Sequence, residues 1–326
     1  MKNLFTRIEE AQISRIKLLY IGGFNQDIQM QAHRRLIPGD SVPGIIKRSP
    51  GGVVRNIAEN SSLLGLNCSL LSICGDDEAG ESILKRTETT GVDCSPCIKM
   101  ENESTCIYSA LLNEEGEMIY AVNQMDLINK LTPSFFESRR EDLEKQDHFV
   151  LDTNLPRESL DYICHTYPDK IILVDPVSTE KFGRLKGLLP YVNTIKPNRI
   201  EAASYTGIDL NCDADYFRAC EKLIEEGAAR VFISSGSKGI FSMDKNQKAL
   251  IPPLKLNPLS VTGAGDAASA ALVLAGLAEL SAAESSWLAN LSAAASLLST
   301  RAINENLSID LLKNISKEYE YEQQLS

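Results

Sequence analysis

The chain has 326 residues, 43% of them hydrophobic, so it can bury a large core, and we expect one main domain with an elaboration. Its 33 basic and 44 acidic side chains give a formal charge of −11, which disfavours binding to nucleic acids and to anionic membrane surfaces. No apolar run approaches the roughly 20 residues that span a bilayer. We therefore expect a cytoplasmic protein with a small-molecule partner.

The eight cysteines and three histidines limit the chemistry further. No signal-like segment precedes the first strand, so we interpret the cysteines as reduced thiols. Cys94 and Cys97 could form half of a zinc or redox site, but no second Cys-x-x-Cys occurs, and packing or turn roles are the commoner use of such residues. No histidine lies in a recognisable nucleophilic motif, which disfavours a triad hydrolase.

Taken in chain order, residues 1–14 are charged and amphipathic, and they predict an appended helix before a main domain over residues 15–316. Buried strands are predicted by short apolar runs at residues 16–21, 69–73, 148–152, 171–175, 194–195 and 231–234. Helical patterns lie between them at residues 56–64, 157–166 and 216–226. The charged tail, residues 317–326, predicts a solvated helix end.

This alternation predicts an α/β fold with a doubly wound, mostly parallel sheet flanked by helices. Ligands bind such sheets beyond the carboxyl ends of the strands, where this chain has the polar residues Asn25, Asp152, Asp175 and Asn198. Two segments, at about residues 28–49 and 104–123, break the alternation. The second has the pattern of a β-hairpin, and together they predict a small β-sheet that projects as a lid.

Residues 262–266 have the sequence Thr-Gly-Ala-Gly-Asp and precede a helix predicted at residues 267–278. Free N–H groups at the start of a helix bind anions, and glycine lets the backbone approach them closely. Asp266 could accept the proton of an attacking hydroxyl while the neighbouring amides hold phosphoryl oxygens. On this pattern alone, an aspartate that caps an ordinary helix is an equally good interpretation.

Asn198 and Glu201 stand three residues apart at the start of a predicted helix, and hence on one face of it. Such a pair can hold magnesium-bound water near ATP phosphates, because magnesium takes few protein ligands and keeps several waters. The same spacing is that of a helix capping box. The two interpretations are compatible, and both remain open.

Three other segments could contribute to binding, although each would be ordinary turn or capping sequence if it stood alone. Asn25 and Asp27 follow the first strand, and Gly51-Gly52 precedes a helix that contains Asn56. Amide and carboxylate groups of this kind suit sugar hydroxyls. Residues 235–239 follow another strand, and their amides could reach nucleotide phosphates, although the segment is not a Walker A motif.

In this order, the segments resemble the ribokinase-like (pfkB) carbohydrate kinases over about residues 16–312. The features are Asn-x-Asp after the first strand, Gly-Gly with a following Asn, Asn-x-x-Glu, a Ser- and Gly-rich loop, and Gly-Ala-Gly-Asp. Within that family, residues 51–60, 116–125, 174–178 and 195–201 resemble the pseudouridine kinases in particular.

The resemblance implies transfer of the ATP γ-phosphoryl group to the 5′-hydroxyl of pseudouridine, which gives pseudouridine 5′-phosphate. A kinase for another nucleoside or sugar, of the ribose, adenosine or fructose type, is the main alternative. A non-catalytic nucleoside sensor on the same fold is a further one. A dinucleotide-binding oxidoreductase is disfavoured, because no Gly-x-Gly-x-x-Gly follows the first strand.

The resemblance also implies a role for each matching residue. The ribose would be held by Asn25, Asp27, Gly51, Gly52 and Asn56. Asp266 would be the catalytic base, and Gly263, Ala264 and Gly265 would form the anion hole. ATP would be bound by Asn198, Ser235, Gly236, Gly239, Thr262, Gly263 and Gly265, and Mg²⁺ by Asn198 and Glu201 through water. Candidates for contacts with the nucleobase are Thr105, Asn123 and Lys181.

The lid would exclude water, which could otherwise accept the phosphoryl group, and it would serve as the interface of a homodimer. Two departures from the family pattern leave features open. Ser260 stands where the family often has an acidic residue, which leaves open whether a monovalent cation such as K⁺ is required. Gln124 stands where related enzymes have an acidic residue, which bears on the choice of nucleobase.

Overall fold

The computed structural model describes residues 2–11 and 13–325. Its strands are β1 Lys17–Ile21, β2 Asn25–Ala32, β3 Gly44–Gly51, β4 Asn67–Leu71, β5 Ile73–Gly75, β6 Ile98–Met100, β7 Ile107–Leu112, β8 Met118–Gln124, β9 His148–Asp152, β10 Ile171–Asp175, β11 Thr194–Ile195, β12 Arg230–Ser234, β13 Ile240–Asp244 and β14 Lys248–Ile251.

Its α-helices are α1 Lys2–Glu10, α2 Val53–Leu63, α3 Glu78–Glu88, α4 Pro133–Ser138, α5 Arg140–Glu144, α6 Arg157–Thr166, α7 Thr179–Phe182, α8 Arg199–Thr206, α9 Asp213–Glu225, α10 Ala264–Leu277, α11 Ala282–Leu297 and α12 Ile309–Leu325. Short 3-10 helices are η1 Ile13–Arg15, η2 Asp126–Lys130, η3 Gly183–Leu185, η4 Leu189–Tyr191 and η5 Gly236–Lys238. Among the described residues, no helix has the length and apolar character needed to cross a membrane. The eight cysteines are free thiols.

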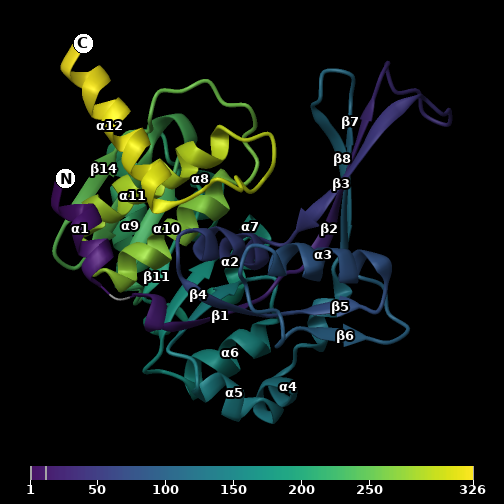
Figure 1. Ribbon diagram of the computed structural model, residues 1–326, viewed down its shortest axis with the longest axis horizontal. Helices are drawn as coiled ribbons and strands as arrows, with labels where there is room; N and C mark the ends of the chain where they lie inside the picture. The colour runs from purple at the N-terminus through teal and green to yellow at the C-terminus, as the bar shows by residue number, and fades with distance from the viewer. Residues whose placement is uncertain (1, 12, 326) are drawn as a thin grey trace.

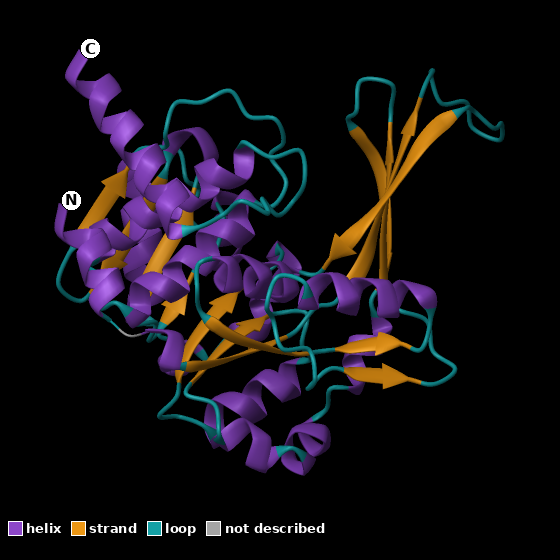
Figure 2. Ribbon diagram, viewed as in Figure 1, coloured by secondary structure: helices purple, strands orange, loops and turns teal. Residues whose placement is uncertain are grey.

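The large sheet has, in the described part of the chain, the strand order β14-β13-β12-β11-β10-β9-β1-β4. Neighbouring strands from β12 to β4 are parallel, and β13 and β14 extend the sheet in antiparallel fashion. Parallel strands need crossover connections, and helices packed around the sheet supply them (Figure 2). The predicted mostly parallel sheet is confirmed, whereas the two antiparallel edge strands were not predicted.

Successive residues of a strand point to opposite faces of a sheet, and this chain builds one core on each face. In β1, Leu18 and Tyr20 are buried with side chains of α1, α2, α10 and α11. Leu19 and Ile21 are buried on the other face with side chains of α6 and α9. Because the central strands are covered on both faces, each is a short apolar run, and β9, β10 and β11 begin and end at the predicted residues.

The topology brings polar strand ends to one edge of the sheet. The strand order reverses between β1 and β9, and a crevice forms at such a point. Asp152 at the end of β9 is the register partner of Asp175 at the end of β10. Gly22 and Gly23 leave β1 at the same edge.

A small sheet with the order β3-β2-β7-β8 projects from the body as a twisted ribbon (Figure 1). It is the sheet predicted from residues 28–49 and 104–123, but β2 begins three residues earlier than the first of these segments. Asn25 and Asp27 therefore lie in the first strand of the lid rather than in a loop after β1. This lid joins the body at the crevice.

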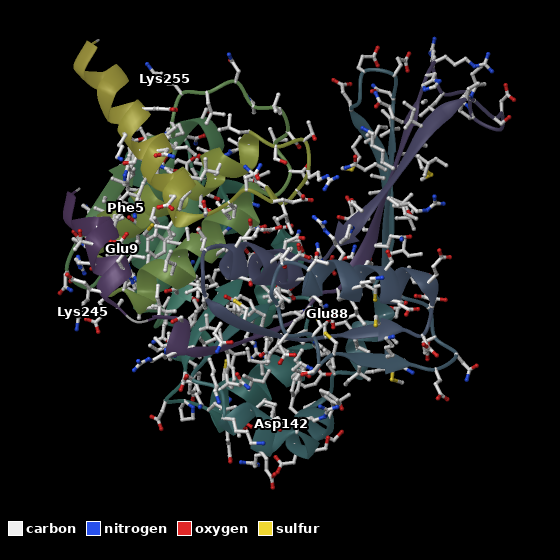
Figure 3. The ribbon with its side chains drawn as sticks, in the orientation of Figure 1. Phe5, Glu9, Glu88, Asp142, Lys245 and Lys255 are labelled. Atoms are coloured by element: carbon white, nitrogen blue, oxygen red, sulfur yellow. The ribbon has the colours of Figure 1, made fainter. Side chains whose placement is uncertain are left out.

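Helix α1 packs on the body through apolar and polar contacts. Leu4 and Ile8 are buried in the core that contains α10 and α11, and Phe5 and Glu9 lie on the same helix (Figure 3). Arg7 donates hydrogen bonds to the carbonyls of Ala278 and Glu279 and to the carboxylate of Glu284. Because the C-terminal end of a helix carries partial negative charge, this guanidinium stabilises the end of α10.

We expect Arg7→Ala to lower the free energy of unfolding by about 1–2 kcal/mol, because it removes a charged donor from two carbonyls and a carboxylate at a site that is one-third exposed. Urea unfolding would measure the change. Arg15→Ala, which truncates an exposed side chain of η1, is the control and should change stability by less than about 0.5 kcal/mol. Equal losses in the two variants would contradict this role for Arg7.

Candidate active site

The start of α10 combines a glycine turn with a carboxylate. Gly263 is the N-cap with φ 87°, and a Cβ atom there would overlap the carbonyl oxygen of Ala302, so the position requires glycine. No side chain of the described residues caps this helix, so its first N–H groups are available to an anion. The predicted start at residue 267 is wrong, because the left-handed glycine lets the helix begin at Ala264 and places Asp266 in its first turn.

Asn56 on α2 contacts Asp266 on α10. The Nδ2 atom of Asn56 donates a hydrogen bond to Oδ2 of Asp266 over 2.7 Å. Burial and the nearby carboxylate of Asp175 raise the pKa of Asp266 to about 7, against the opposing effects of Asn56, Lys196 and Arg55. A carboxyl group with this pKa is substantially ionised at neutral pH and can accept a proton.

The predicted acceptor residues converge beside this pair. Asn25 Nδ2 donates to Asp27 Oδ1 over 2.7 Å, and the register of β2 and β3 sets Asn25 opposite Gly51. A Cβ atom on Gly51 would overlap the Asp27 carboxylate, and one on Gly52, which has φ 103°, would overlap the carbonyl of Gly23. Burial raises the pKa of Asp27. Lid and body therefore meet with no room for a side chain between them.

Arg55 lies beneath these residues, and sequence reasoning did not single it out. Its side chain is 1% exposed. The guanidinium donates hydrogen bonds to the carbonyl of Gly51 (2.6 Å), to Oδ1 of Asn56, to the carboxylate of Glu59 and to the hydroxyl of Thr87 (3.2 Å). One buried cation thus contacts two of the predicted acceptor residues.

The carboxylate of Asp152 joins three segments at the crevice. Its Oδ2 accepts the N–H of Gly23 after β1 (2.9 Å) and the N–H of Val54 at the start of α2 (3.0 Å). Asn154 donates to it through both its backbone and its side chain. Burial raises the pKa of Asp152, and these N–H donors oppose the rise. The sequence placed Asp152 at this edge but did not indicate that it holds the helix.

A second buried ion pair lies next to Asp266. Lys196 Nζ is 3.3 Å from Asp175 Oδ2, and the two side chains are 5% and 8% exposed. Ser269 on α10 donates to the same carboxylate oxygen over 3.0 Å. A Cβ atom on Gly265 would lie 3.8 Å from Lys196 Nζ, so this ammonium group lies close to the glycine turn. The position of Lys196 directly after a buried strand was the one signal in the sequence that could have identified it.

Asn198 and Glu201 form the capping box of α8. Asn198 Oδ1 accepts the N–H of Glu201 over 2.9 Å, and Glu201 Oε2 accepts the N–H of Asn198 over 2.8 Å. Burial raises the pKa of Glu201. Within the described residues, no group of three or more His, Cys, Asp or Glu side chains could hold a metal. The pair could thus supply one carboxylate to an ion whose other ligands are water and phosphate.

The loop at residues 235–239 lies beside the start of α8, because the N–H of Ser234 donates to the carbonyl of Pro197 over 3.0 Å. Ser235 shares a 2.6 Å hydrogen bond with the hydroxyl of Tyr216. Gly236 and Gly239 have φ values of 49° and 92° and let this loop turn tightly. The structure therefore brings two of the predicted nucleotide segments, residues 235–239 and the start of α8, together.

Two of the three candidate nucleobase contacts are engaged within the protein. The buried hydroxyl of Thr105 donates to Asp77 Oδ1 over 2.6 Å and accepts the N–H of Gly75 over 3.1 Å. Lys181 Nζ donates to Asn154 Oδ1 over 2.6 Å, which attaches it to the crevice through Asp152. No hydrogen bond or ion pair links Thr105 to Asp266 in the described part of the chain.

The third candidate, Asn123, is exposed on β8 and belongs to a row that crosses the lid. Asp27 on β2 is the register partner of Tyr108 on β7, which is in turn the partner of Asn123. Register partners share a face of a sheet. Asn123 and Tyr108 therefore lie on the lid face that carries Asp27.

A separate cavity of about 180 Å³ lies at the amino ends of the strands, where side chains such as Leu272 and Val273 of α10 line it. It is on the edge of the sheet opposite to the clustered polar residues. The crevice at the carboxyl ends, rather than this cavity, has the groups that can carry out chemistry.

Comparison with known proteins agrees with this geometry. The family model described as pfkB family carbohydrate kinase matches residues 15–309. The chain is 36% identical to the pseudouridine kinase of Escherichia coli (strain K12), over 78% of this chain and 82% of that protein. It is 33% identical to the uncharacterised sugar kinase YeiI of the same strain, over 89% of this chain and 80% of that protein.

Among solved structures, the ribokinase of Arabidopsis thaliana complexed with ribose and ATP matches with a TM-score of 0.80 at 19% identity, over 93% of this chain and 99% of that chain. Similarity at this level of identity concerns the fold. The arrangement of sheet, helices and lid is that of a ribokinase-like protein.

We expect Asp266→Asn to stabilise the protein at alkaline pH. An unperturbed aspartate titrates near pH 4, whereas Asp266 has a pKa of about 7, so folding disfavours its charged form. The penalty grows as the pH rises from about 4 to 7 and is complete above 7, where we expect the variant to gain roughly 1–3 kcal/mol. Urea unfolding across this pH range would measure the difference in the free energy of unfolding between the variant and the unaltered protein. A difference that is the same at every pH would contradict the prediction.

Proposed function

This chain belongs to the pfkB family of carbohydrate kinases, and on that premise we propose that it transfers the γ-phosphoryl group of ATP to the 5′-hydroxyl of pseudouridine. Membership of the family makes it a phosphotransferase with an alcohol group as acceptor. The observation that carries the proposal is the hydrogen bond between Asn56 and Asp266, which joins the acceptor residues of α2 to the base at the start of α10.

In the proposed reaction, Asn25, Asp27 and Asn56 hold the hydroxyl groups of the ribose, so that its 5′-oxygen faces Asp266. Asp266 accepts the proton of the 5′-hydroxyl as that oxygen attacks the γ-phosphorus of ATP. The bond from the γ-phosphorus to the bridging oxygen breaks, and ADP leaves with the electron pair. The products are pseudouridine 5′-phosphate and ADP.

The glycine turn stabilises the negative charge on the transferring phosphoryl group. The N–H groups of the N-cap Gly263 and of the first residues of α10, at positions 264 and 265, have no side-chain cap, and the dipole of that helix adds to their positive potential. Lys196 contributes a cation close to Gly265. Donors held in place by a helix need little reorganisation during the reaction.

We assign ATP binding to the loop at residues 235–239 and the start of α8, which adjoin each other. Glu201 is engaged in the capping box through Oε2, so its other oxygen is suited to a magnesium-bound water. The ion would neutralise the phosphate charges and favour departure of ADP. A requirement for ATP agrees with the cytoplasmic location expected from the sequence.

Assignment of pseudouridine rests on the similarity to a pseudouridine kinase and on the polar row of the lid. The uracil ring of pseudouridine presents N–H donors and carbonyl acceptors, and the amide of Asn123 can pair with either. Lys181 can donate to a carbonyl from the side of the body. Because an uncharacterised sugar kinase is similarly related, another nucleoside or a sugar is the alternative acceptor.

We expect ATP consumption to be faster with pseudouridine than with uridine, adenosine, ribose or fructose, measured in a coupled assay with and without K⁺. Asp266→Asn should lower the rate roughly 10²- to 10⁴-fold while pseudouridine still binds, since it removes the base and keeps the shape. Asp169→Asn, at an exposed position, is the control. Equal rates with all acceptors would exclude pseudouridine specificity, and binding without turnover would favour a sensor.

We propose further that two copies associate through the apolar face of the lid. The register places Ile46, Met30, Leu111 and Tyr120 in one row across the four strands. This row lies on the face opposite to Asp27, and Tyr120 and Val122 are 70% and 72% exposed. An exposed apolar surface of this kind is typical of an interface.

We expect Val122→Asp to shift the protein from dimer to monomer in sedimentation velocity experiments, because a charge would be buried at the interface. Leu298→Asp, which alters an exposed leucine after α11, is the control and should leave the distribution unchanged. If Val122→Asp and the unaltered protein sediment alike, the apolar face of the lid is not the interface.

A further inference from the structure

We propose that Arg55 is a positioning residue of the acceptor site, which holds the side-chain amide of Asn56 with its NH₂ group toward Asp266 and holds the Gly51-Gly52 turn through a backbone carbonyl. The inference rests on the proposed role of Asp266 as the base. It assigns a role to the largest fully buried side chain of the described residues.

Complete burial of an arginine calls for an explanation. A guanidinium stays charged at every physiological pH, and the removal of such a charge from water is unfavourable by several kcal/mol. Burial lowers the pKa of Arg55, while Glu59, Asp27 and Asp266 act in the opposite direction. Apolar side chains of similar volume often stabilise a core as well as a buried ion pair does, so packing alone does not account for this residue.

The donors of Arg55 are directed at the acceptor site. Nε donates to the carbonyl of Gly51, and Nη2 donates to Oδ1 of Asn56. Nη1 donates to Glu59 and Thr87, and Thr87 also donates to Glu59 over 2.8 Å. Because the guanidinium is planar and its N–H directions are fixed, the contacts with Glu59 and Thr87 on one side determine where Gly51 and Asn56 can lie on the other.

The contact with Arg55 decides the orientation of the Asn56 amide. The two ends of an amide have nearly the same shape, but one accepts hydrogen bonds and the other donates them. With a cation at Oδ1 and the Asp266 carboxylate at Nδ2, a single orientation satisfies both neighbours. A flipped amide would set its oxygen against the carboxylate and its NH₂ group against the guanidinium.

Arg55 also contributes to the electrostatics of Asp266. The charged groups that face this carboxyl are Arg55 on α2, Asp175 at the end of β10 and Lys196 after β11, and Asn56 is its hydrogen-bond donor. Loss of Arg55 removes one of the two cations and leaves the amide free to turn. Both changes disfavour the ionised form of Asp266.

The test uses Arg55→Met together with Glu59→Met, because Arg55→Met alone would leave a buried carboxylate unpaired and could prevent folding. The first measurement needs no acceptor. It compares the free energy of unfolding of the protein with Asp266 and with Asp266→Asn as a function of pH, once in the otherwise unaltered protein and once in the double variant. We expect the midpoint of that dependence to move up by about one pH unit in the double variant. An unchanged midpoint would overturn the inference, whatever the enzyme phosphorylates.

The second measurement is kinetic and uses the acceptor that the unaltered protein phosphorylates fastest. In the double variant we expect kcat to fall roughly 10- to 100-fold, with the acid limb of kcat/KM displaced in the same direction as the stability midpoint. Arg55→Lys keeps the charge without the planar fork, so it should lower kcat and leave the acid limb near its original position. A normal kcat in both the double variant and Arg55→Lys would overturn the positioning role of Arg55.

Arg230→Met is the matched control, because Arg230 is a largely buried arginine at the opposite edge of the sheet that donates to Leu280 and Ser285. We expect Arg230→Met to lower the free energy of unfolding without displacing the acid limb of kcat/KM. Failure of the proposed function gives a different result: Asp266→Asn would then keep full turnover, or no acceptor would be phosphorylated, while the stability midpoints would still report on Arg55.

Discussion

The buried carboxylate of Asp152 is the contact on which the arrangement of the site depends. It accepts N–H groups from Gly23, just after β1, and from Val54 at the start of α2, so one group sets the position of the chain leaving a strand relative to a helix. A buried carboxylate is unfavourable unless donors surround it, and these N–H groups would be left unsatisfied without it. As a result α2 has one position over the crevice, and Asn56 meets Asp266 on α10.

The crevice concentrates charge that the rest of the core excludes. Asp175 pairs with Lys196, Arg55 pairs with Glu59, and Asp266 lies between the two pairs, where burial and Asp175 raise its pKa to about 7. A carboxyl group in this state lowers the stability of the fold but is suited to proton transfer at neutral pH. The proposed acceptor site is also shared between two parts of the molecule, because Asp27 lies on the lid and Asp266 on the body. Movement of the lid would therefore change the site itself.

Strands buried on both faces were the features most easily predicted. Their sequences are short apolar runs between polar residues, and for β9, β10 and β11 the boundaries agree with the structure. The start of α10 was misplaced because the pattern of small residues does not reveal that Gly263 adopts a left-handed conformation. β13 and β14 were missed because they follow β12 in the sequence without an α-helix between them, so the helical patterns that marked the parallel strands are absent there. Asn25, Asp27 and Gly51, which the sequence grouped as acceptor candidates, lie together in the structure, but the sequence did not show that Asn25 and Asp27 lie in the lid.

The sequence by itself determined the family, the alternating α/β order, the glycine turn and the acidic and amide groups at the strand ends, because each of these depends on residues close together along the chain. Only the tertiary structure decided which of these groups touch. Asn56 and Asp266 are 210 residues apart, and Asp175 ends β10 whereas Lys196 follows β11. An arginine within a helix is ordinarily exposed, so the sequence offered no reason to place Arg55 in the core. Its burial, and with it the orientation of Asn56, follows from the packing of α2 against the lid, α3 and α10, which no local pattern encodes.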